Sequence, residues 1–550
     1  MNKSTVIIIS ILVLIGLFVR LAPTHLNVSE NMPPVITSWD VFWHTTFTKW
    51  IVDSHNSDIM PSYKTGGIPA LSPEPRILPI NSAALTWFTG IPAYQTAFIF
   101  TALMSLIVVL LIFVVVRRYF GETAGIITLF LGIVPVSAQT WFFQMMVGFW
   151  RDFGAMAMAL AGIIILLQGL EAGLSWKHSA VIGILFSGAL MAHAQEFFFY
   201  APFLGGVVVL WMLFKKTTWH SLIKTGVALL IAIVLSINFL SMMNTSYQVG
   251  GSLAQGLSTL GTFQQMQSYF PSPSLPAIFT ILIIAGLGIS ALNFKKLSIT
   301  KLSILALWFF FLFVSFSRFI GLNSNYTTRQ IYMGYALLLL PAVIAIMFII
   351  SLINAKVSKK VTGIAIIILG FVYVLSFAPT SYSQFSNLKS SFGDKAHWDA
   401  IIWIKDNTPK DAKVFALSGY EHEFYTFSER TVFKGDLGLQ HTQTNIQQLC
   451  NQQIPEKFRG EWGYWLYNNP KGYAVSRIGY SDFNHEMISD FNVSIENDTK
   501  SQEPLSKFNY VLFQHSGEQW SPCMQWFKQQ MINNNHHVVY ENEEMAIVKL

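Results

Sequence analysis

Two acidic residues lie next to long apolar segments, and their carboxylates can take a proton from an acceptor or bind a divalent cation. Asp40 follows the first apolar segment, and Asp152 immediately precedes a later one. A positioned carboxylate acts as a general base, and carboxylate oxygens are the ligands that Mg²⁺ and Mn²⁺ prefer. The two acids are therefore candidate catalytic residues and candidate ligands of one Mg²⁺ or Mn²⁺ ion.

Each acid has an ionisable neighbour that bears on its role. His44 follows Asp40 by four residues, so in a helix the two share a face, and His44 is either a metal ligand or the group that orients Asp40. The alternative is that Asp40 only caps a helix at the membrane interface. Arg151 precedes Asp152 and either neutralises it or joins the site. An ionisable pair at the mouth of a membrane span favours a functional role.

Further candidates lie at two other predicted turns on the same side of the membrane. His193 and Glu196 lie between two apolar segments, where Glu196 either completes the site or only caps a helix. Arg318 and Arg329 flank a short loop. A guanidinium binds phosphate through two parallel hydrogen bonds, so both are candidate ligands of a donor phosphate, and Arg329 is preferred. The alternative is that they extend to lipid headgroups.

The composition predicts a polytopic α-helical membrane protein. Of 550 residues, 52% are hydrophobic and 12% are charged, whereas soluble domains carry about 25% charged residues. A span needs about 20 apolar residues, and the chain offers about eleven such segments. They lie near 5–21, 95–116, 122–139, 151–169, 178–193, 197–214, 221–240, 275–293, 301–318, 331–353 and 361–378.

The basic residues predict the orientation of these segments. If the spans alternate, the Lys and Arg residues of six short segments fall on one side, which is the cytoplasmic side by the positive-inside rule. They are Lys3, Arg117, Arg118, Lys177, Lys215, Lys216, Lys295, Lys296, Lys356, Lys359 and Lys360. We expect a multi-pass protein of the plasma membrane with a cytoplasmic N-terminus and an extracellular C-terminal domain. Asp40 and Asp152 then both lie at the outer face.

This topology predicts two domains. Residues 1–378 form the membrane domain, with large outer loops at about 22–94 and 241–274. Residues 379–550 have mixed polarity and ordinary charge, and a segment of this length can bury a core of its own. We expect it to be a soluble domain outside the membrane.

The soluble part has the patterns of a mixed α/β domain. Apolar residues recur at helical spacing over Trp398–Ile404, and buried-strand patterns occupy Val414–Leu417 and Ala546–Leu550. Cys450 and Cys523 both lie in this part. Outside the cell they either form a disulfide or remain two isolated thiols.

Three short motifs follow one another in the order found in a known family. They are WDVFWH at 39–44, GFWRD at 148–152 and HWDAIIWIKDNTP at 397–409. The pattern resembles the GT-C glycosyltransferases, and most closely the catalytic subunit of archaeal oligosaccharyltransferase. The resemblance implies that Asp40 and Asp152 bind the metal and activate the acceptor, and that Arg329 lies near the donor phosphate. It also implies a donor sugar on polyprenyl (dolichyl) phosphate or diphosphate, used at the outer face of the membrane.

Two departures from the family bear on the acceptor. The family's Trp-Trp-Asp-Tyr-Gly motif is replaced by ALSGYEH at 416–422, and 241–274 contains no Asp or Glu. We therefore expect an inverting glycosyltransferase whose acceptor is a lipid, a polysaccharide or a protein site other than Asn-x-Ser/Thr. The alternatives are an inactive membrane-anchored binding protein of the same fold, and a transporter of lipid-linked sugars. A transporter would place ionisable residues near the bilayer midplane.

Overall fold

The chain divides into two compact units. A computed structural model describes residues 3–22, 39–57, 76–134, 150–240, 277–316, 324–386, 395–417, 428–436, 473–478, 502–504, 509–514, 528–529, 531–533 and 535–550. The first unit consists of Met1–Val41, Glu74–Ser241 and Val249–Lys389. The second consists of Phe42–Pro73, Met242–Gln248 and Ser390–Leu550.

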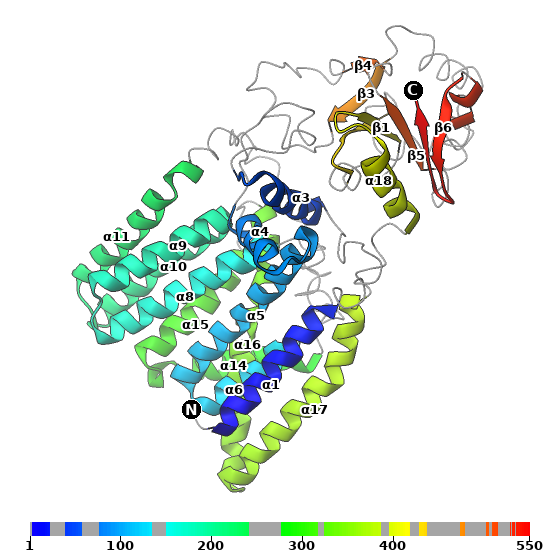
Figure 1. Ribbon diagram of the computed structural model, residues 1–550. Helices are drawn as coiled ribbons and strands as arrows, with labels where there is room; N and C mark the ends of the chain where they lie inside the picture. The colour runs from blue at the N-terminus through cyan, green and yellow to red at the C-terminus, as the bar shows by residue number, and fades with distance from the viewer. Residues whose placement is uncertain are drawn as a thin grey trace. The chain divides into compact units, whose positions relative to one another are not determined.

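The described part of the first unit is helical, and a helix overlaps each segment that the sequence predicts as a span (Figure 1). Their bounds are α1 Lys3–Arg20, α5 Ala93–Phe120, α6 Glu122–Ile133, α8 Trp150–Ala172, α9 Trp176–Ala192, α10 Ala194–Leu213, α11 Trp219–Leu235, α14 Ala277–Leu292, α15 Ile299–Phe316, α16 Ser324–Asn354 and α17 Lys359–Ser386. A further helix, α4 (Ile77–Thr89), falls within the predicted outer loop. A 3₁₀ turn, η2 (Phe294–Lys296), follows α14.

Several of these helices have the length and composition of membrane spans. Among the described residues, four helical segments are long and apolar enough to cross a membrane: Ala93–Phe120, Trp150–Ala172, Glu196–Leu213 and Lys359–Ser383. Shorter apolar helices accompany them at Thr5–Arg20, Glu122–Ile133, Trp176–Ala192, Trp219–Leu235, Ile281–Leu292 and Leu339–Asn354. These are the helices of a membrane protein, and the number and direction of the spans stay predictions.

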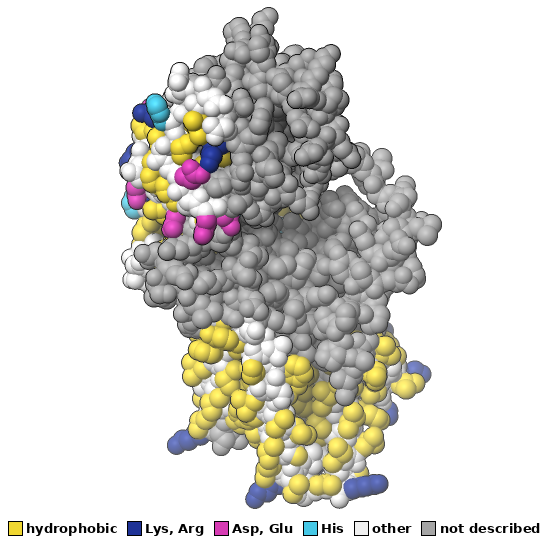
Figure 2. All heavy atoms as spheres, turned by 90° about the vertical axis from the view of Figure 1, so that its right-hand side faces the viewer, with side chains coloured by type: hydrophobic (Ala, Val, Ile, Leu, Met, Phe, Trp, Pro, Cys, Tyr) yellow, Lys and Arg dark blue, Asp and Glu magenta, His cyan; other side chains and the backbone are white. Residues whose placement is uncertain are grey.

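Basic side chains gather at one end of the helical unit, beyond a surface of hydrophobic side chains (Figure 2). Contacts join several helix ends there. The Thr5 hydroxyl donates to Glu122 (2.9 Å), and Glu171 pairs with Arg118 (3.1 Å) and accepts from the Thr300 hydroxyl (3.0 Å). These residues come from the start of α1, α6 and α15 and from the end of α5 and α8. Alternating spans with basic connections predict such an end.

Two pairs of helices in this unit come close together at a glycine. A Cβ added at Gly286 of α14 would lie 1.8 Å from the carbonyl oxygen of Pro341 in α16. Gly370 of α17 lies in the same way against the ring of Phe130 in α6, where an added Cβ would be 2.4 Å from Cδ2. Small residues let helix backbones come close where lipid provides no hydrophobic driving force for their association.

The second unit contains α3 (Trp39–Ser54, from Phe42 on), α18 (Lys395–Asn407) and one mixed sheet. The described strands have the order β4-β3-β2-β1-β5-β7-β6. Strand β1 pairs in parallel with β2 and β5, and the other described pairs are antiparallel. The bounds are β1 Lys413–Leu417, β2 Thr431–Asp436, β3 Tyr473–Ile478, β4 Gln502–Pro504, β5 Tyr510–Gln514, β6 His537–Glu541 and β7 Met545–Lys549.

The core of this unit lies between α18 and the sheet. Ile401 and Ile404 of α18 are fully buried, as are Val511 and Phe513 of β5 and Ile547 of β7. The apolar spacing in the sequence therefore marks the core-facing side of α18. The two strand patterns of the sequence coincide with β1 and β7.

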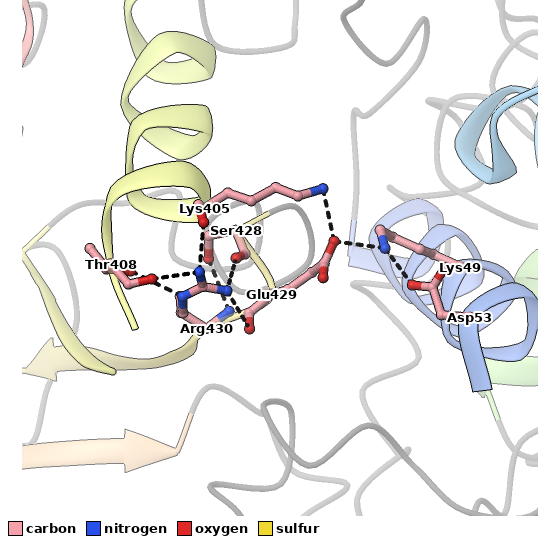
Figure 3. A network of polar contacts seen from close by, with 7 residues as sticks. All are labelled: Lys49, Asp53, Lys405, Thr408, Ser428, Glu429 and Arg430. Carbon is pink, nitrogen blue, oxygen red and sulfur yellow. Dashed lines mark hydrogen bonds and ion pairs between the residues drawn. The ribbon is translucent and has the colours of Figure 1, made fainter. Parts of the chain in front are cut away.

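A buried arginine binds the C-terminal end of α18 (Figure 3). Arg430 is 5% exposed. Its guanidinium donates to the carbonyl oxygens of Lys405 (2.6 Å), Thr408 (2.8 Å) and Ser428 (3.1 Å), and to Thr408 Oγ1 (3.0 Å). The last carbonyls of a helix have no partners within the helix, and the helix dipole favours a cation beside them. The Asn-Thr-Pro end of α18 thus serves as the binding site of this side chain.

Removing this guanidinium should destabilise the second unit. We expect Arg430→Met to lower its free energy of unfolding by about 3 kcal/mol, because buried carbonyl oxygens lose their donors. Amide hydrogen exchange of β1 and β5 peptides in the full-length protein measures this. Lys528→Met, which breaks the ion pair with Glu541, is the control and should have a small effect. Equal effects of the two substitutions would contradict the prediction.

Candidate functional site

Three ionisable side chains meet where α8 and α10 begin. Nδ1 of His193 lies 2.8 Å from Oδ1 of Asp152. One possible ligand atom from each of Asp152, His193 and Glu196 lies within 4.8 Å of the other two. The exposed fractions are 1%, 9% and 0% respectively. We call this group the acid–histidine cluster.

The backbone at His193 brings two of these side chains together. Helix α9 ends at Ala192 and α10 begins at Ala194, so His193 alone connects them, in an extended conformation (φ −162°, ψ 109°). Its N–H donates to the carbonyl of Ala189 (2.8 Å), and its carbonyl accepts from the N–H of Glu196 (3.1 Å). The two helices lie side by side (Figure 1). This one-residue connection places His193 and Glu196 at the same end of the pair.

Asp152 reaches the cluster because α8 packs against both α9 and α10. It lies in the first turn of α8, and Glu196 lies in the first turn of α10. The positive end of a helix dipole attracts negative charge, and a carboxylic side chain lies at each of these two helix starts. Two helix N-termini therefore contribute to the site.

The cluster lies at the end of α8 opposite to the basic end of the unit. Asp152 and Glu171 are 19 residues apart in α8, which corresponds to about 28 Å along the helix. The hydrocarbon core of a bilayer is about 30 Å thick. The acid–histidine cluster and the ion pair between Glu171 and Arg118 thus belong to opposite ends of one membrane-length helix.

Tyr200 adjoins the cluster and was not predicted from the sequence. It follows Glu196 by one helical turn, is fully buried, and interacts electrostatically with both Glu196 and Asp152. It ends the run Phe197–Tyr200. In such a run a tyrosine of the site has the same signature as an aromatic residue of the core, so the sequence alone offered no signal.

The donor set fits a divalent cation. Two carboxylates and one imidazole supply oxygen and nitrogen ligands, and all three side chains are held by helix ends. Imidazole suits Zn²⁺ and carboxylates suit Mn²⁺ or Mg²⁺. A metal-binding histidine is usually oriented by a neighbouring carboxylate, and Asp152 is close enough to His193 to serve either as that neighbour or as a ligand.

The other residues of the predicted metal site lie in α3. Asp40 is the second residue of α3, and its side chain lies outside the described part. His44 is buried and belongs to the second unit. A shared site of Asp40, His44 and Asp152 therefore stays a prediction. Arg151 lies next to Asp152 in α8 and is half-buried.

The remaining predicted residues are not located. Arg318, Cys450 and Cys523 lie outside the described residues. The backbone of Arg329 lies in α16, and its side chain is outside the described part. Phosphate binding by the arginines and the disulfide between the cysteines stay predictions.

Comparisons with known proteins place the fold. No family model matches the chain, and no curated protein matches it. The Archaeoglobus fulgidus oligosaccharyltransferase in complex with Zn and sulfate matches with a TM-score of 0.55 at 14% identity, covering 92% of this chain and 67% of that chain. The archaeal oligosaccharyltransferase AglB from Archaeoglobus fulgidus, with an inhibitory peptide and a dolichol-phosphate, gives a TM-score of 0.52 at 13% identity, covering 93% of this chain and 69% of that chain.

A second enzyme matches over nearly its whole length. Apo ArnT from Cupriavidus metallidurans has a TM-score of 0.52 at 11% identity, covering 99% of this chain and 97% of that chain. ArnT and the oligosaccharyltransferase both belong to the GT-C superfamily, and the resemblance predicted from the sequence motifs is confirmed. At these identities the likeness concerns the fold. The chain has the fold of the GT-C glycosyltransferases.

Proposed function

We propose that the protein is a metal-dependent GT-C glycosyltransferase, and that Asp152, His193 and Glu196 bind its divalent cation. The observation that carries the proposal is the acid–histidine cluster, whose ligand atoms lie within 4.8 Å of one another in a GT-C fold. The mixed donor set favours Mn²⁺ or Zn²⁺ over Mg²⁺, because Mg²⁺ takes oxygen ligands in a strict octahedron.

The proposed reaction is a direct displacement at the anomeric carbon of the donor sugar. The bond from this carbon to the carrier phosphate breaks, and a bond to the acceptor atom forms with inversion. A bound cation supplies charge neutralisation for the phosphate that leaves. Asp40 accepts the proton of the acceptor. Arg329, assisted by Arg318, donates hydrogen bonds to the phosphate.

The donor in this proposal is a sugar on a polyprenyl (dolichyl) phosphate or diphosphate. Support comes from the dolichol-phosphate bound to the archaeal oligosaccharyltransferase of the same fold, and from the position of the cluster at one end of a membrane-length helix. We place this end at the outer face, because the opposite end carries the basic residues. The acceptor is a protein, a lipid or a polysaccharide.

Metal titration of the purified protein in nanodiscs tests the proposal. We expect saturable binding of Mn²⁺ or Zn²⁺ by calorimetry, and weaker binding to Glu196→Gln. Release of sugar from polyprenyl-phosphate donors should require the ion and stop on chelation. The sugar is followed by mass spectrometry, first with water and then with candidate acceptors.

Each result separates the proposal from its alternatives. Metal binding without sugar release from any donor tested would favour the inactive binding protein of the same fold. Movement of intact lipid-linked sugar between leaflets would favour the transporter. Sugar release that is insensitive to chelators would contradict the metal assignment and favour the pair of Asp152 and His193 as a general base.

A further inference from the structure

A single glutamate of the second unit lies between two lysines from different elements (Figure 3). Glu429 Oε1 lies 2.8 Å from Nζ of Lys49 in α3 and 2.9 Å from Nζ of Lys405 in α18. Lys49 also pairs with Asp53, one turn further along α3. Glu429 thus joins α3, from the predicted first outer loop, to the start of the C-terminal domain.

The backbone of Glu429 holds a conformation that this residue type rarely adopts. Its φ is 57°, in the left-handed region, where side chains other than glycine are strained. The next residue, Arg430, anchors this turn. Its guanidinium donates to the carbonyls of Ser428 and Glu429 and to the Thr408 end of α18. The anchored turn directs the Glu429 carboxylate toward Lys49.

The anchor gives a structural role to the end of the third sequence motif, at 397–409. Thr408 lies in the Asn-Thr-Pro end of α18 and binds Arg430 through both its hydroxyl and its carbonyl. The hydroxyl of Thr408 also donates to the carbonyl of Ile404 (2.6 Å). The motif at the start of the C-terminal domain therefore connects, through Arg430 and Glu429, to Lys49 on α3.

Helix α3 carries this connection to the predicted catalytic residues. It is continuous from Trp39 to Ser54 and contains Asp40, His44 and Lys49. Because a helix is stiff over four turns, fixing its C-terminal half restricts the direction of its first turn. A contact at Lys49 therefore acts on Asp40 without touching it.

We infer that Glu429 is a positioning residue, which clamps α3 to the C-terminal domain and thereby sets the placement of Asp40. The inference rests on the proposed function for the role of Asp40. The clamp itself is a property of the second unit, so it can be measured independently of catalysis.

Hydrogen exchange of the full-length protein in nanodiscs tests the clamp directly. In Glu429→Gln, amides of α3 between 45 and 54 should exchange roughly tenfold faster than in the wild type, because the ion pair that joins α3 to Glu429 is lost. Lys49→Gln should have a similar effect. The double variant should add little to either change, since both remove the same contact. Unchanged exchange in α3 would overturn the clamp.

Glu541→Gln is the matched control. It removes one carboxylate from another ion pair of the same unit, with Lys528, and should leave exchange in α3 at the wild-type rate. Faster exchange in this variant would show that any loss of charge loosens α3, and the specific role of Glu429 would be wrong.

Turnover measurements then test the positioning of Asp40. Glu429→Gln should lower kcat for sugar release with little change in Mn²⁺ affinity, and should have no further effect in an Asp40→Asn background. Full turnover of Glu429→Gln beside an impaired Asp40→Asn would overturn the positioning role. Full activity of Asp40→Asn would also overturn the positioning role. Full activity of Asp152→Asn would contradict the proposed function but would not affect the hydrogen-exchange result for the clamp.

The clamp should persist in mild acid. Partial burial by itself would raise the pKa of the Glu429 carboxyl, but hydrogen bonds and charge attraction from Lys49 and Lys405 outweigh it and lower the pKa from 4.5 to about 2. The folded-state pKa is below the unfolded one, so the stabilisation is present above about pH 4.5 and is lost as the pH falls toward 2. The difference in Tm between wild type and Glu429→Gln should therefore be constant between roughly pH 7 and 5 and shrink by roughly pH 3. A difference that is independent of pH would contradict this.

Discussion

Asp152→Asn should reduce sugar release by at least about 10²-fold and weaken Mn²⁺ binding by about 10- to 100-fold. Asn keeps the size of the side chain but removes the charge. If Asp152 binds the ion, the substitution replaces an anionic ligand by a neutral one; if it orients His193 across their 2.8 Å contact, the imidazole loses a charged acceptor and keeps at most a neutral one. Calorimetry and donor-hydrolysis kinetics on the same preparation measure the two effects.

Glu122→Gln is the matched control for this substitution. Glu122 is also an acid in the first turn of a helix, α6, but it lies at the basic end of the unit, where it accepts from Thr5. We expect near wild-type metal affinity and turnover from it. Wild-type behaviour of Asp152→Asn, or an equal loss in Glu122→Gln, would contradict the assignment of the site to the acid–histidine cluster.

Gly286→Ala should prevent α14 and α16 from packing as they do, and lower the free energy of unfolding by about 3 kcal/mol or more. The added Cβ would lie 1.8 Å from the carbonyl oxygen of Pro341. A backbone atom of a helix cannot turn aside as a side chain can, so the two helices must separate. We expect a lower Tm of the purified protein and a lower yield of folded material.

Gly288→Ala provides the comparison within the same helix. Within the described part of the chain, nothing lies within 4 Å of a Cβ added at Gly288, and alanine has a higher helix propensity than glycine. This substitution should leave Tm unchanged or raise it slightly. Equal Tm values for the two alanine variants would show that the close approach of α14 and α16 does not hold the bundle together.

The helices were predictable because their signal is local. An apolar run such as Ala93–Phe120 is a candidate span whatever surrounds it, and basic residues at its end, such as Arg117 and Arg118, indicate direction. The strands β1 and β7 were visible for the same reason. Helix α4 was assigned to a loop, since 13 residues are too few to read as a span.

The site was predictable only in part, because its members come together through packing. Asp152 was predicted as a site residue because it is an acid at the end of a membrane span. Glu196 was rated lower, since an acid in the first turn of a helix has the same sequence signature whether it caps the helix or binds a metal. The approach of α8 to α10, which brings Glu196 near Asp152 and His193, cannot be predicted from the sequence. Glu429 and Arg430 gave no signal, because neither the burial of Arg430 nor the left-handed φ of Glu429 follows from their neighbours in sequence.

Because a single residue connects α9 to α10, this connection has no extra length that could absorb an insertion. Inserting one residue after His193 would rotate Glu196 by about 100° around α10 and move it by about 1.5 Å along the axis, away from Asp152. Side chains elsewhere on these helices can be exchanged for others of similar size without such an effect. Distant relatives that share the site should therefore keep the spacing of His193 and Glu196 while other residues drift. The spacing of His193 and Glu196, together with an acid at the start of α8, is a sequence pattern that can identify such relatives when their overall identity is too low to do so.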